Sequence, residues 1–182
     1  MPIKFADMVL SGNGPLPLGT YTVRCLSAEL GATAKGDPCI KTKWEIVGPP
    51  IVEVDGKKYN QAGRQFWPGP QSLDPSNGRN GIGAFLDKLS NAGFDMSSMS
   101  TDEGDAFDES KVAALVGFTC DMSLSSEPQF KTRLPTQEEI AAGVRPTERI
   151  PLVDGAGDKV SSGHRIKAWL TDITGPATNA GL

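Results

Sequence analysis

Two segments of the chain, Thr20–Ala28 and Cys39–Val47, alternate between apolar and polar residues. A period of two is typical of a β-strand that buries one face and exposes the other. The loop Gly31–Pro38 is short enough for the two strands to pair, so we expect an antiparallel pair. Its polar face is predicted to carry Thr22, Arg24, Lys41, Lys43 and Glu45, and its apolar face Tyr21, Val23, Cys25, Ile40, Trp44 and Ile46.

A hairpin and a helix are predicted in the middle of the chain. Ile51–Tyr59 is divided by Asp55-Gly56, a dipeptide that strongly favours a two-residue hairpin turn, so this segment predicts a protruding β-ribbon. Apolar residues then recur at intervals of three and four over Ile82–Ala92, which predicts an amphipathic helix. Gly93 follows at the position where helices often end on a glycine.

Four further elements are predicted in the second half. Asp108 is a suitable N-cap for a short helix that ends near Gly117, and Phe118–Leu124 alternates as a strand. Thr136–Glu139 has the sequence of a capping box and predicts a third brief helix. His164–Leu170 is the last predicted strand.

These elements favour a mainly β protein. Five to seven antiparallel strands around one central helix fit a small barrel better than a parallel sheet. We therefore expect an OB-like Greek-key barrel with a central helix, a protruding β-hairpin and long loops. The expected segments are an N-terminal arm over residues 1–19, the barrel over residues 20–171, and a short polar tail over residues 172–182.

Composition agrees with a β-rich globular domain. The 182 residues include 21 glycines and 14 prolines, which favour turns, and 38% of the residues are hydrophobic. Three cysteines without a CxxC motif argue against a disulfide scaffold and for a reducing compartment. No apolar run approaches the roughly 20 residues of a membrane span, and the N-terminus lacks the pattern of a signal peptide. We expect a soluble cytoplasmic protein without membrane contact.

Catalytic chemistry finds little support in the sequence. The single histidine, His164, has no G-x-S-x-G nucleophile motif to accompany it. One histidine and three scattered cysteines do not make a zinc tetrad. We therefore expect no enzyme activity, no cofactor and no metal site, and we expect the cysteines to pack in the core.

Acidic residues are concentrated in one segment, Asp95–Glu109, which contains six acids and no base. Its spacing does not match an EF-hand loop. A solvated loop is expected there, with a partner-facing patch or a weak divalent-ion site as alternatives. Six of the 22 acids lie in this segment, which leaves 16 against 18 basic residues elsewhere. The net charge of −4 therefore does not exclude an anion-binding face.

Basic residues and a tryptophan share the predicted outer faces of the strands. Arg165, Lys167 and Trp169 lie on one face of the last strand, and Trp169 would stack on bases unless a loop or a neighbouring subunit covers it. Cations that follow a phosphate backbone, with an aromatic ring among them, are typical of single-stranded nucleic acid binding. The expected contacts are Arg24, Lys41, Lys43, Arg165, Lys167 and Trp169, with Arg64, Phe66 and Trp67 as further candidates.

The sequence also resembles a group of bacteriophage early proteins. The resemblance rests on Gly19–Glu29, Lys35–Pro38 and Ile40–Ile46, which follow the pattern G-x-Y-x-V, A-E, G-x-P and W-E-I. It implies an OB-fold protein that binds single-stranded DNA in phage replication or recombination, in the bacterial host cytoplasm, with other replication or recombination proteins as partners. The acidic tail that such proteins often use for recruitment is absent from Thr174–Leu182.

A virion structural protein is the main alternative. A capsid decoration, tail or adaptor β-domain would also be rich in glycine and proline, acidic and without an active site. The sequence leaves open whether the chain forms a homo-oligomer and whether it prefers DNA or RNA.

Overall fold

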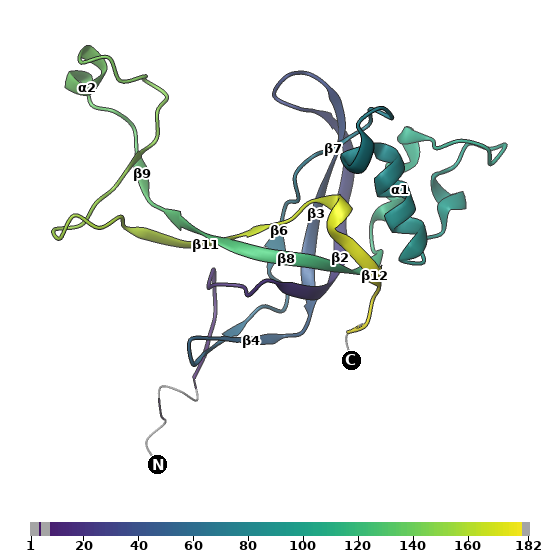
Figure 1. The fold of residues 1–182 in the computed structure, drawn as a ribbon, viewed down its shortest axis with the longest axis horizontal. Helices are drawn as coiled ribbons and strands as arrows, with labels where there is room; N and C mark the ends of the chain where they lie inside the picture. The colour runs from purple at the N-terminus through teal and green to yellow at the C-terminus, as the bar shows by residue number, and fades with distance from the viewer. Residues whose placement is uncertain (1–3, 5–7, 180–182) are drawn as a thin grey trace.

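The protein is built around a twisted antiparallel sheet, seen in the computed structural model, which describes residues 4 and 8–179. Its main strands are β2 (Gly19–Ala32), β3 (Pro38–Gly48), β6 (Gln65–Phe66), β8 (Thr119–Phe130) and β11 (Ser161–Lys167). They are ordered β11-β8-β2-β3-β6, and two short strands extend the sheet: β7 (Gln71–Ser72) pairs with β3, and β12 (Ile173–Pro176) pairs with β8 (Figure 1).

The β2–β3 pair confirms most of the predicted alternation. In its register Cys25 lies opposite Trp44 and Val23 lies opposite Ile46, and all four side chains are buried. The indole N–H of Trp44 donates to the Thr42 hydroxyl at 2.8 Å, so its polar atom is satisfied inside the core. The three cysteines are free and buried, as predicted.

Helical segments cover one end of this sheet. The longest helix of the described residues is α1 (Ile82–Asn91), whose apolar stripe buries Phe85 and Leu89 and which ends before Gly93 at a φ of +86°. The other segments are short 3₁₀ turns: η2 (Gly78–Asn80), η3 (Met96–Met99), η4 (Glu109–Leu115) and η5 (Leu170–Asp172). Within the described residues no helix is long and apolar enough to cross a membrane.

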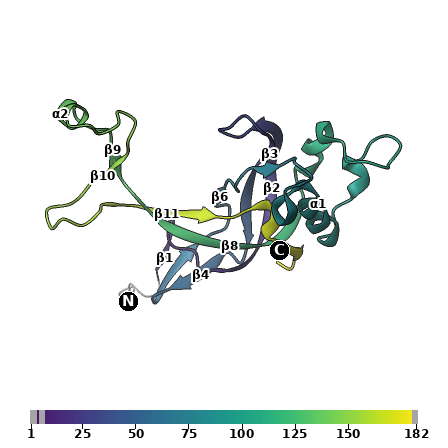
Figure 2. The ribbon, with the colours of Figure 1, turned by 45° about the horizontal axis from the view of Figure 1, so that its top comes forward.

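Two β-ribbons extend from the sheet (Figures 1 and 2). One is the predicted hairpin of β4 (Ile51–Val54) and β5 (Lys57–Asn60), with β1 (Val9–Leu10) added parallel to β5. Asp55 and Gly56 both have positive φ, as a two-residue turn of this kind requires.

The second ribbon is formed where β8 and β11 run on past the sheet. At its far end lie β9 (Thr132–Arg133), α2 (Gln137–Ala141) and β10 (Ile150–Pro151). The predicted capping box is present at the start of α2: the Thr136 hydroxyl accepts from the backbone N–H of Glu139, and the Glu139 carboxylate accepts from that of Thr136.

The chain is mainly β, with 42% strand and 18% helix, which confirms the predicted class. The sheets are open, and the two edges of the main sheet approach each other at a single bridge between Gly69 and Trp169. There the backbone N–H of Gly69 donates to the carbonyl of Ala168 at 3.0 Å.

Both terminal segments pack on the sheet. In the expected arm, Leu16 is buried and its backbone N–H donates to the Ser126 hydroxyl at 2.7 Å. In the expected polar tail, Ile173 is fully buried and Thr178 donates through its hydroxyl to the Asp121 carboxylate at 2.6 Å. This tail segment covers Thr22, so the prediction of an outward, exposed Thr22 is wrong.

Candidate nucleic-acid interface

The predicted site residues that come together lie along one line, which we call the seam. It is the surface where residues 64–69 face residues 164–169, that is, where β6 and its following loop lie against β11 and its following residues. Hydrogen bonds tie the two sides: Arg64 Nη2 donates to the carbonyl of His164 at 2.6 Å, and the N–H of Gly69 donates to Ala168.

Two exposed tryptophans are the most prominent groups on the seam. Trp67 is 65% exposed and Trp169 is 52% exposed. Both line one hollow of about 250 Å³, together with Arg165 and Lys167. The structure thus brings two aromatic rings and two cations to one concave surface.

Trp169 is held in place by its backbone and by a glycine. Its backbone N–H donates to the Asp172 carboxylate at 2.8 Å, and part of its indole ring lies against the backbone of Gly69. A Cβ at Gly69 would lie within 2.8 Å of three ring carbons, so only glycine permits this approach. One side of the indole is therefore packed, while about half of the Trp169 surface remains exposed.

Trp67 owes its exposure to the register of β3 and β6. Because Trp44 pairs with Phe66, both of these rings face the core, and the next residue, Trp67, faces outward. Lys43 shares this outer face, with Nζ 5.2 Å from the Trp67 ring centroid, a cation–π contact. Phe66 is only 3% exposed, so its expected role as a stacking ring is wrong.

The predicted cations divide into those with and those without a carboxylate partner. Arg165 forms an ion pair with Glu127 and Arg24 forms one with Glu45. The Arg165 guanidinium lowers the pKa of Glu127, because it stabilises the charged carboxylate. Within the described part of the chain Lys167 forms no ion pair, although its charge also helps to lower the pKa of Glu127.

Two of the predicted basic residues, Arg24 and Lys41, lie apart from the seam. Arg24 is on β2, on the far side of β3 from the seam, where its Nε donates to Glu45 at 2.8 Å. The Lys41 side chain lies across Gly31 of β2, where a Cβ would lie 2.9 Å from Lys41 Cδ. Neither residue lines the hollows described here.

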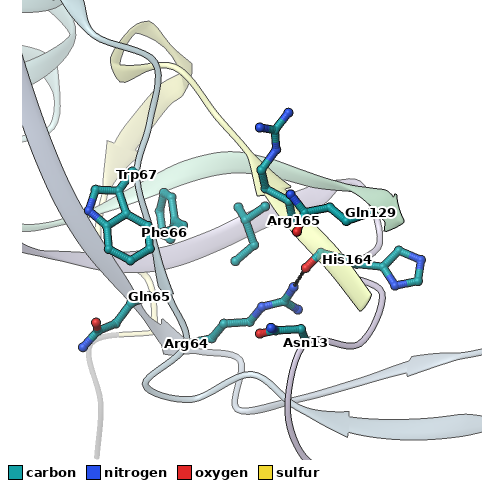
Figure 3. Close-up of a pocket in the computed structure, with 9 residues that line it drawn as sticks. Asn13, Arg64, Gln65, Phe66, Trp67, Gln129, His164 and Arg165 are labelled. Carbon is teal, nitrogen blue, oxygen red and sulfur yellow. Dashed lines mark hydrogen bonds between the residues drawn. The ribbon is translucent and has the colours of Figure 1, made fainter. Parts of the chain in front are cut away.

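Arg64 forms the base of a second hollow, of about 390 Å³ (Figure 3). Nη1 donates to the carbonyl of Gly14 at 2.6 Å and to the side-chain oxygen of Gln61 at 2.8 Å, in addition to the bond from Nη2 to His164. Two polar residues that line this hollow, Asn13 and Gln129, were not predicted from the sequence.

Two further hollows adjoin the two hollows of the seam. A hollow of about 350 Å³ between Pro70 and Thr171 shares Trp169 with the 250 Å³ hollow. The 250 Å³ hollow shares Trp67 and Arg165 with the Arg64 hollow. The Arg64 hollow in turn shares lining residues with another hollow, of about 480 Å³, near Ser11. The concave surface at the seam is therefore divided among hollows that share lining residues, and it is not a single pocket.

The acidic segment Asp95–Glu109 has local roles in the structure. Asp95 caps η3 by accepting from the N–H of Ser97, and Asp108 caps η4 by accepting from the N–H of Ser110. Lys111, just beyond the segment, contacts Asp102 at 3.0 Å and Asp108 at 3.7 Å. Across residues 4 and 8–179, His, Cys, Asp and Glu side chains do not gather in threes as a metal site would need.

The seam thus combines two exposed aromatic rings with basic side chains. Comparison with known proteins assigns no family: no family model matches the chain, and no curated protein matches its sequence.

Proposed function

We propose that the protein binds single-stranded DNA along the seam, without base-sequence preference and without catalysis. The observation that carries this proposal is the pair of exposed rings, Trp67 and Trp169, on one hollow with Arg165 and Lys167. In this proposal the sheet is an OB-like barrel whose two edges meet at the bridge between Gly69 and Trp169.

Exposed tryptophans need a physical reason. A large ring in water loses the favourable burial that usually stabilises it, and two such rings on one concave surface are typical of a binding site. A base of any identity has a flat face that can stack on an indole. In duplex DNA the base faces are already stacked on each other, so the rings favour a single strand.

The cations of the seam match a phosphate backbone. Lys167 forms no ion pair among the described residues, although it acts on Glu127 at longer range, and Lys43 lies over Trp67, where it would remain close to the phosphate next to a stacked base. Arg165 is paired with Glu127, so it contributes less net charge than its position alone indicates. The proposed partners beyond the strand are phage replication or recombination proteins.

Titration of the protein with oligo(dT) tests this proposal. Stacking should quench tryptophan emission, and Trp67→Ala or Trp169→Ala should each weaken binding by about 1–3 kcal/mol. Phe130→Ala is the matched control, since Phe130 is also exposed, also has a lysine over its ring, Lys159 at 5.4 Å, and lies at the end of β8, where it lines none of the hollows described here. Equal effects from all three variants, or no binding by the parent protein, would reject the proposal.

A virion structural role is the second candidate, favoured by a different surface. The three-stranded sheet of β1, β5 and β4 exposes Val9, Leu10 and Ile51, and exposed apolar residues on a small sheet are typical of subunit contacts. Light scattering on the full chain distinguishes the two. A homo-oligomer that Ile51→Lys dissociates, together with no affinity for oligo(dT), would favour the virion role.

A further inference from the structure

Arg64 is half-buried and has no carboxylate partner among the described residues, whereas the other described arginines without an ion pair, Arg79, Arg145 and Arg149, are exposed. Its guanidinium donates to three neutral oxygens, those of Gly14, Gln61 and His164. An arginine has five N–H donors, so two of them lack a partner among the described residues. Arg24, Arg133 and Arg165 each have a glutamate partner, whereas Arg64 has no carboxylate partner in the described part of the chain.

The charge of Arg64 is also partly withdrawn from water. Burial lowers the pKa of Arg64, although a guanidinium remains charged at neutral pH. A half-buried cation without an anion is unfavourable, because neutral acceptors replace only part of its hydration. An anion entering the hollow would supply the missing interaction.

The side chain of Gln61 helps to fix the orientation of the Arg64 guanidinium. This side chain is fully buried and its oxygen accepts from Arg64, yet its Nε2 has no hydrogen-bond partner within the described residues. Leaving a buried donor unpaired usually costs stability, so such a group needs an explanation. Fixing the Arg64 guanidinium at the base of the hollow provides one.

The hollow has the size and the walls for a phosphate with an attached base. Its volume, about 390 Å³, lies in the range of small-ligand sites. Trp67 lines it together with Asn13 and Gln129, and in Figure 3 the two amide side chains lie on the opposite side of the view from Trp67. In Figure 3 the Arg165 guanidinium points away from that of Arg64, which leaves Arg64 as the cation of this hollow.

We propose that the Arg64 hollow binds one phosphate group of the bound strand, with the neighbouring base against Trp67. This inference rests on the proposed function, because it names the part of the strand that the hollow takes. It separates Arg64, which binds a phosphate at a fixed position, from surface cations such as Lys167, which attract the backbone over a distance.

Arg64 itself is a poor choice for the test, since its removal would also release Gly14 and His164 and could unfold the seam. Gln129→Glu is a more specific test, because it should leave the fold intact. Gln129 is exposed on β8, forms no side-chain hydrogen bond with the described residues, and lines the hollow. The variant places a negative charge beside the site without removing a contact. Gln137→Glu on exposed α2 is the matched control with the same change in net charge.

The experiment measures binding of labelled oligo(dT), of thymidine monophosphate and of inorganic phosphate to the parent and both variants. Gln129→Glu should weaken oligo(dT) binding about ten-fold, the loss expected for one charged contact, and Gln137→Glu should change it less than two-fold. The shift in melting temperature with phosphate, against chloride at equal ionic strength, should also shrink in Gln129→Glu alone.

The outcomes distinguish this inference from the proposed function. Tight oligo(dT) binding that both variants affect equally would overturn the Arg64 site and leave the function standing. Binding of phosphate and thymidine monophosphate without oligo(dT) would overturn the strand as the source of the phosphate, and with it the proposed function. Binding of none of the three probes would overturn both.

Discussion

Replacing Gly69 with alanine tests whether the backbone of one side of the seam positions the ring on the other. The added Cβ would lie within 2.8 Å of three Trp169 ring carbons, so the ring must leave its place against Gly69. About half of the ring surface is covered, on the order of 100 Å², which at about 25 cal/mol per Å² corresponds to about 2.5 kcal/mol as an upper limit. For a chain of 182 residues this predicts a melting temperature lower by about 5–10 °C.

A double-mutant cycle with Trp169→Ala shows whether the effect passes through the ring. Thermal unfolding and oligo(dT) titration are measured for the parent, both single variants and Gly69→Ala/Trp169→Ala. Once the ring is gone the alanine has nothing to displace, so Gly69→Ala should cost almost nothing in the Trp169→Ala background. A Gly69→Ala protein with unchanged melting temperature, emission spectrum and oligo(dT) affinity would refute the packing described for Trp169.

Three further predictions concern the core, the ribbon end and the salt dependence. Phe85→Ala should destabilise the fold by about 3–5 kcal/mol in urea unfolding, because its ring, on the apolar stripe of α1, is fully buried. Hydrogen bonding to Arg133 lowers the pKa of Glu139 from 4.5 to about 2. The stabilisation by this pair is therefore present above about pH 4.5 and is lost as the pH falls towards 2. An NMR titration of Glu139 should give a midpoint near pH 2, and Arg133→Ala should raise this midpoint. Lys167→Ala should flatten the plot of log affinity against log salt by about 0.7, and Arg24→Ala, away from the seam, should leave the slope unchanged.

The elements that the sequence predicts well are those with a local signal. The faces of β2 and β3 follow from alternation, α1 follows from a stripe that includes Phe85, and the hairpin follows from Asp55-Gly56. The capping box of α2 follows from four consecutive residues. Each of these signals depends on neighbours in the chain, so the sequence is sufficient to place them.

Other features depend on contacts between distant segments. Ile173–Pro176 contains a glycine and a proline and has no strand pattern of its own, yet it pairs with β8 because Ile173 is buried there. Thr22 alternates as a surface residue, and the return of the chain at Asn179, together with Asp121 of β8, buries it. The alternation at Phe66 and Trp67 was too short to show which ring faces outward, and pairing with Trp44 decides it.

The candidate site is harder to predict than the fold because it depends on which charges remain uncompensated. The sequence selects Arg24, Arg165 and Lys167 on equal terms, since each is a basic residue on the outer face of a strand. In the structure two of them lie beside a glutamate of the neighbouring strand, and such a pair attracts a phosphate less than an isolated cation does. Arg64 shows the opposite case, because its partners are neutral oxygens. The cross-strand register, more than the number of basic residues, therefore decides where an anionic strand would bind.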